Sequence, residues 1–153
     1  MSARVLRVSP ISAILPNLPR MLAFDGATCV LMGIMLTFAT KPLAIALALP
    51  ENLLFVAGVM LFPCALMMFT GAGRARWTAT IARATIGLNL AWIAGSALVA
   101  TALFSPNAVG LAFVWMQACA VAAITLVEWQ ALRRWPAATG APGAAPAPDE
   151  VTT

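Results

Sequence analysis

The chain has 153 residues and a formal net charge of +4; 62% of its residues are hydrophobic, only 9% are charged, and none is His or Tyr. A soluble domain usually carries about a quarter charged residues, so this composition excludes an ordinary soluble surface and predicts an integral membrane protein. The lack of histidine also excludes imidazole haem ligands and nucleophile pairs that use a histidine base.

Residues 1–20 have a basic start and three prolines but no clean apolar core of their own. We interpret them as an N-terminal cytoplasmic or interfacial segment. The alternative is a cleavable signal, with the first apolar run as its core and "ALALP" as a cleavage-like site. Asp25 lies inside that core and argues against cleavage.

Four apolar stretches follow, at about 21–40, 52–70, 78–104 and 107–133. Each is near or above the roughly 20 residues that a helix needs to cross a hydrocarbon core. The backbone must satisfy its own hydrogen bonds in lipid, so helices are predicted rather than strands. Pro63 should kink the second helix. The sequence thus predicts an all-α, integral membrane four-helix bundle over residues 21–134.

Two further segments are predicted not to cross the membrane. "KPLAIALALPENLL" is apolar but is broken by Pro42 and Pro50, so we expect it at the outer interface between spans one and two. The stretch 135–153 is rich in Ala, Pro and Gly and cannot bury a core. We therefore expect a disordered cytoplasmic tail there.

Basic residues gather at one end of the predicted bundle, namely Arg4, Arg7, Arg20, Arg74, Arg76, Arg83, Arg133 and Arg134. The other end has only Lys41, which Glu51 balances. Positive residues mark the cytoplasmic side of a membrane protein. The pattern predicts a multi-pass protein of the bacterial cytoplasmic (inner) membrane with both termini inside (N-in/C-in).

Three ionisable side chains, Asp25, Arg83 and Glu128, fall inside three different spans. A rise of about 1.5 Å per residue places all three about 6 to 9 Å from the inner side. Arg83 could pair with both carboxylates as a structural clasp, and the cluster could also serve as a proton or ion relay. Snorkelling of each side chain, or a surface pair of Asp25 with Arg20, remains an alternative.

Two amides, Asn89 and Gln117, are predicted near the membrane midplane. They could hydrogen-bond to each other and clamp spans three and four together. The alternative is a ligand site with Trp92 and Trp115 as pocket walls. Helical spacing puts Asn89 on one face with Thr85, Trp92 and Ser96.

Small side chains recur every four residues on two spans, as Asp25, Cys29 and Gly33 on the first and Gly87, Ala91 and Gly95 on the third. Such stripes let helices approach closely. Putting the two stripes together would bring Asp25 to Arg83. The stripe on the third span could equally join two copies of the chain.

Cys29, Cys64 and Cys119 show neither metal-ligand nor disulfide spacing and are interpreted as packing residues. No phosphate loop, dinucleotide fingerprint or acidic metal cluster is present. We expect no metal, no cofactor and no enzymatic activity. The charge pattern is explained by topology, so we expect no nucleic-acid partner; the expected partners are the lipid bilayer and other membrane proteins or further copies of the chain.

Several phrases, "DG" at Asp25, "LPENLLFVAG", "NLAW", "GLAFVWMQA" and "EWQALRR", resemble an uncharacterised family of short four-span bacterial inner-membrane proteins. The resemblance covers about 21–134 and implies a four-helix fold without supplying a reaction. The matching polar positions are Asp25, Asn89, Trp92, Gln117, Glu128 and Arg134. Trp129 departs from the pattern, because the similar proteins are expected to carry Tyr there.

The leading functional hypothesis is a non-enzymatic scaffold or accessory subunit of a membrane complex. The alternative is a small transporter or a proton- or ion-conducting homo-oligomer that uses Asp25, Arg83 and Glu128. A relay requires a wet path past Asn89 and Gln117 to the outer face. The outer stretches "MGIMLTFA" and "ALVATALF" are dry apart from two threonines, which favours the scaffold.

Overall fold

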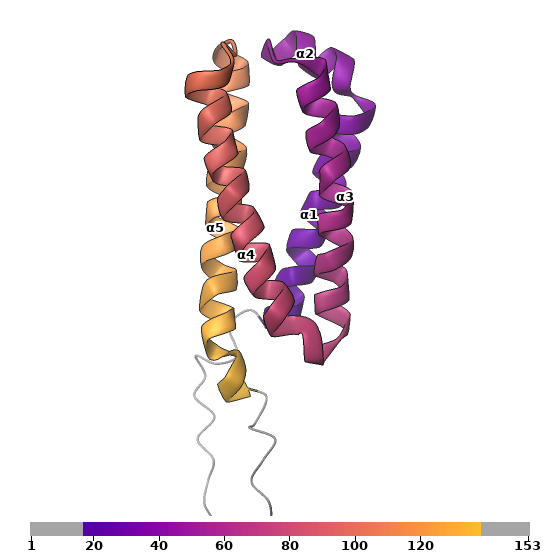
Figure 1. Cartoon of the computed structure of the whole chain (residues 1–153), viewed down its shortest axis with the longest axis vertical. Helices are drawn as coiled ribbons and strands as arrows, with labels where there is room; N and C mark the ends of the chain where they lie inside the picture. The colour runs from indigo at the N-terminus through magenta and orange to yellow at the C-terminus, as the bar shows by residue number, and fades with distance from the viewer. Residues whose placement is uncertain (1–16, 139–153) are drawn as a thin grey trace, which may run out of the picture.

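The computed structural model describes residues 17–138, which form a helical bundle without strands (Figure 1). The helices are α1 (Leu18–Phe38), α2 (Thr40–Leu47), α3 (Glu51–Gly73), α4 (Ala75–Leu98) and α5 (Ala108–Ala138), with a π-helical segment η2 (Val99–Leu103) after α4. Within residues 17–138, four helical segments are long and apolar enough to cross a membrane: Leu18–Phe38, Glu51–Gly73, Ala75–Leu103 and Ala108–Trp135. The prediction of an all-α membrane four-helix bundle is confirmed, and its N-in/C-in orientation stays a prediction.

The four long helices form two pairs. Helix α1 packs most extensively against α3, and α4 against α5, while the pairs meet chiefly where α3 turns into α4. Figure 1 shows the start of α1 and the end of α5 at the same end of the bundle, with α2 at the opposite end. The seam between the two pairs is where the polar interior lies.

Helices α1 and α3 approach closely because glycines face each other at their crossing. A Cβ at Gly58 would lie 2.6 Å from the Thr37 hydroxyl oxygen and 2.9 Å from Leu36 Cβ. A Cβ at Gly33 would lie 3.1 Å from the carbonyl oxygen of Gly58. Small residues of this kind let backbones make direct van der Waals contact, which drives helix association in lipid.

The predicted pairing of the two small-residue stripes is wrong. Gly33 packs against α3. A Cβ added at Gly87 or Gly95 of α4, in contrast, would have no atom of a neighbouring helix within 4 Å. The buried residues of α4 are instead Thr78, Ala82, Thr85, Ile86, Asn89 and Ser96. This face carries the polar side chains, which are costly to expose to lipid, so it turns inward and the glycine stripe turns outward.

The end of the bundle opposite the start of α1 and the end of α5 is closed by a link between α2 and α5. The side-chain amide of Asn107 donates to the Ala46 carbonyl at 2.8 Å, and its backbone N–H donates to the Leu47 carbonyl at 3.3 Å. A Cβ at Gly110 would collide with that Leu47 carbonyl. An apolar cluster fills this end, consisting of Leu36, Leu47, Leu49, Leu54, Leu61 and Val114.

The observed helix bounds differ from the predicted spans mainly at the chain ends. Helix α1 begins at Leu18, with a proline in its first turn, where a missing N–H costs nothing. Helix α5 continues to Ala138, so residues 135–138 belong to it rather than to the predicted tail. Helix α3 runs through Pro63 without interruption. The predictions for 1–16 and 139–153 lie outside the described residues.

Candidate functional site

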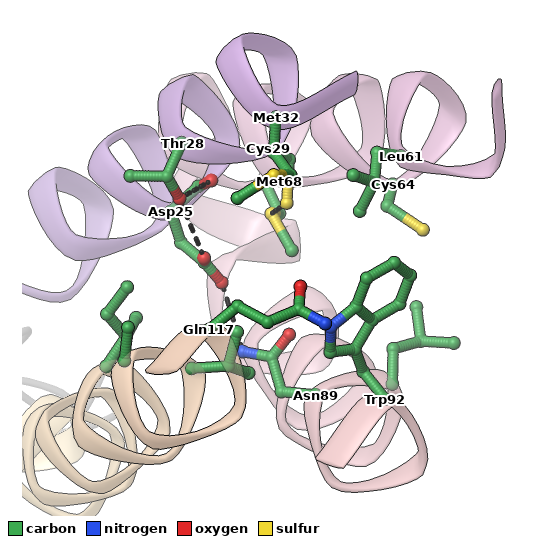
Figure 2. Close-up of a pocket in the computed structure, with 14 residues that line it drawn as sticks. Asp25, Thr28, Cys29, Met32, Leu61, Cys64, Met68, Asn89, Trp92 and Gln117 are labelled. Carbon is green, nitrogen blue, oxygen red and sulfur yellow. Dashed lines mark hydrogen bonds between the residues drawn. The ribbon is translucent and has the colours of Figure 1, made fainter. Parts of the chain in front are cut away.

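A pocket of about 180 Å³ lies between the two helix pairs and is lined by all four long helices (Figure 2). Its polar lining comes from Asp25, Thr28, Asn89 and Gln117. The remaining walls are aliphatic, sulfur-containing or aromatic, with Trp92 as the aromatic side chain. The pocket thus combines one carboxyl group with a largely apolar surround.

Asp25 is buried, with 3% of its surface exposed. Its Oδ2 accepts a hydrogen bond from Asn89 Nδ2 at 3.1 Å, across the seam from α4 to α1 (Figure 2). The hydroxyl of Thr28 donates a hydrogen bond to the backbone carbonyl oxygen of Asp25 at 2.8 Å, and it lies 3.4 Å from the side-chain Oδ1. These donors are neutral, so they orient the carboxyl group without supplying a counter-charge.

Glu128 is fully buried on α5, with 0% of its surface exposed. Neither carboxyl oxygen has a hydrogen-bond partner among the described residues, and the buried hydroxyl of Thr85 also lacks one. Asp25 and Glu128 are both acidic, so ionisation of both within one apolar interior is unfavourable. Because native proteins pair nearly all buried polar atoms, this unpaired carboxyl requires an explanation.

The structure does not bring Arg83 to the two carboxyl groups. Arg83 is exposed, and residues 17–138 contain no ion pair from it to Asp25, whose side-chain donors are Asn89 and Thr28, or to Glu128. Six residues separate Arg83 from Asn89, which places them about 120° apart around a helix. The predicted three-charge cluster is therefore reduced here to a pair of carboxyl groups.

The two midplane amides both line the pocket but do not bond to each other. Asn89 donates a hydrogen bond to Asp25. Gln117 Nε2 instead donates a hydrogen bond to Ser96 Oγ at 3.5 Å. Gln117 thus links α5 to α4, as the clamp hypothesis expected of the pair, but through Ser96.

The two candidate wall residues have different positions. Trp92 lines the pocket. Trp115 is 42% exposed and is not part of the lining, to which α5 contributes Gln117 and Val121 among others.

Some residues that line the pocket were not predicted from the sequence to belong to a site. Thr28 lies one turn after Asp25, the spacing at which a threonine hydroxyl reaches back to the preceding turn. Cys29 on α1 and Met68 on α3 bring their sulfurs to 4.0 Å in the pocket wall. Their proximity could be known only from how α1 meets α3.

The two carboxyl groups are the main chemical groups that the site offers. No group of three or more Cys, Asp or Glu side chains within residues 17–138 could hold a metal ion. A buried carboxyl pair of this kind can bind a proton or a cation, and transfer it when access changes. No protein-family model, curated protein or solved structure matches the chain, and the resemblance drawn from its motifs stays a prediction.

Proposed function

We propose that the protein is a small, non-enzymatic membrane transporter in which Asp25 and Glu128 take up a proton on one side of the bilayer and release it on the other. The observation that carries this proposal is the fully buried Glu128 carboxyl group, both of whose oxygens lack a hydrogen-bond partner in residues 17–138. Ionisable residues in membrane spans are costly and mark ion or proton pathways by default.

Within residues 17–138 no cation pairs with either carboxyl group, which removes the main structural explanation for them. A clasp would require Arg83, which is exposed. Without it, two carboxyl groups in one apolar interior lower the stability of the fold rather than raise it. A feature that lowers stability is most simply retained because the protein uses it.

The surroundings of the site favour a carrier over an open pore. Polar side chains continue from Asp25 and Asn89 to Gln117 and Ser96. Beyond them, toward α2, the apolar cluster around Leu36 and Val114 closes the bundle. A proton would therefore leave on that side only after the two helix pairs move relative to each other, as in alternating access.

We place this carrier in the bacterial cytoplasmic membrane with both termini inside, as the basic residues indicate, and a homo-oligomer fits the proposal. An accessory subunit is the second candidate. The open stripe at Gly87 and Gly95, where a Cβ would meet nothing within 4 Å, leaves room for a helix of another membrane protein.

The test is proton flux into liposomes that contain the purified protein, driven by a potassium diffusion potential. We expect flux with the wild type and at least a tenfold loss in both Asp25→Asn and Glu128→Gln. Glu51→Gln is the matched control, because Glu51 is an exposed carboxyl group at the start of α3. Flux no higher than in protein-free liposomes would reject the transporter and leave the accessory subunit.

A further inference from the structure

The pocket contains an acidic group that no basic side chain of its lining balances. Asp25 is its one charged lining residue within the described part of the chain, and no Lys or Arg takes part in the lining. The donors that Asp25 has, Asn89 and Thr28, are neutral. When Asp25 is ionised, the pocket therefore favours a positively charged occupant.

The pocket walls show what kind of cation fits. Calcium and magnesium ions require about six or more oxygen ligands, which the mostly apolar lining does not provide. Trp92 offers an aromatic face of the kind that attracts organic cations. Thioether and aliphatic side chains complete the wall, represented by Met32, Met68 and Ile124. This lining matches an organic cation whose charged nitrogen carries apolar alkyl or aryl groups.

The pocket reaches the surface of the protein at membrane depth. Leu88 belongs to its lining and is 45% exposed. It lies about 20 Å along the helix from Ala75, well inside a span. The apolar cluster around Leu36 and Val114 closes the α2 end of the bundle. A ligand would thus arrive from the lipid phase, which again selects for apolar groups.

We propose that this pocket binds a small organic monocation with apolar substituents, such as an aryl quaternary ammonium, held between Asp25 and Trp92 and admitted from the bilayer beside Leu88. A closed cavity of about 150 Å³ accommodates benzene. The pocket of about 180 Å³ also opens beside Leu88, so the charged group can lie at Asp25 while part of the aromatic ring lies in the opening. The proposal rests on the proposed function, because the cation would occupy the carboxyl group that also takes the proton.

The experiment is calorimetric titration of phenyltrimethylammonium into the full chain in nanodiscs of neutral lipid, with tert-butylbenzene as an uncharged competitor of the same shape. We expect Asp25→Asn to weaken binding at least tenfold and Trp92→Leu about threefold or more. Trp115→Leu is the matched tryptophan control and Glu51→Gln the carboxyl control; both should leave the affinity unchanged. Circular dichroism and thermal unfolding of each variant establish that it is folded.

The proposal is overturned if phenyltrimethylammonium does not bind, if Asp25→Asn binds as well as the wild type, or if tert-butylbenzene competes as strongly as the cation. The last result would identify an apolar site for lipid chains. Proton flux in liposomes separates the two proposals: flux without cation binding leaves the transporter standing and rejects this ligand class. Binding that depends on Asp25 without flux supports the ligand site and rejects the transporter.

Discussion

Asn89 of α4 donates a hydrogen bond to Asp25 of α1 across 64 residues of sequence, with 3.1 Å between Nδ2 and Oδ2. Both side chains are buried. Because α1 belongs to one helix pair and α4 to the other, this bond joins the pairs at the level of the pocket. It also fixes the direction of the carboxyl group that we propose as the ligand and proton site.

This bond should appear as an energetic coupling between the two residues. In a double-mutant cycle of Asp25→Ala and Asn89→Ala, we expect a coupling of about 0.6–2 kcal/mol, the range for interhelical hydrogen bonds in membranes. The measurement is the free energy of unfolding in micelles. A parallel cycle of Asp25→Ala with Arg83→Ala serves as the control and should give a coupling near zero.

Glu128 should lower the stability of the protein. Glu128→Met keeps a similar volume and removes two buried oxygens that lack partners. We expect it to raise the free energy of unfolding by about 1–3 kcal/mol, since unsatisfied buried polar groups carry a penalty of that size, while proton flux is lost. Glu51→Met, at an exposed position, should gain no comparable stability. A loss of stability in Glu128→Met would show that the carboxyl group has a partner that stabilises it.

The sequence predicted the helices better than the rotation of each helix. Depth follows from counting residues, and the expectation that Asp25 and Glu128 lie near one level stays a prediction. Rotation depends on which of two stripes turns inward. On α4 one stripe holds Arg83 and Gly87, and the other holds Thr85 and Asn89.

The sequence does not reveal which stripe is buried, because both offer a plausible helix contact. Close approach at glycines favours the first stripe, and satisfying polar side chains away from lipid favours the second. The structure buries the second, so Asp25 meets Asn89 instead of Arg83. On α5 a similar uncertainty in rotation, here of one residue, separates buried Val114 from exposed Trp115.

Arg83 should contribute little to the stability of the fold. It is exposed and has no ion pair with Asp25 or Glu128 in residues 17–138. We therefore expect Arg83→Gln to change the free energy of unfolding by less than about 0.5 kcal/mol, as for other surface substitutions. Chemical denaturation in micelles measures it. A loss of about 3 kcal/mol or more, the size expected for breaking a buried ion pair, would restore the clasp hypothesis.

Two glycine-to-alanine substitutions should have opposite effects, because their surroundings differ. A Cβ at Gly58 would lie 2.6 Å from the Thr37 hydroxyl oxygen and 2.9 Å from the Thr37 backbone nitrogen, so α1 and α3 must separate. We expect Gly58→Ala to lower the free energy of unfolding by about 1–3 kcal/mol through overpacking. Gly87→Ala meets nothing within 4 Å and should raise it by about 0.5–1 kcal/mol, because alanine restricts the unfolded chain and favours the helix. Unfolding of both variants in the same micelles compares them directly. If Gly87→Ala instead destabilises the protein and lowers its oligomeric state in size-exclusion chromatography with light scattering, the glycine stripe of α4 is a contact between copies of the chain.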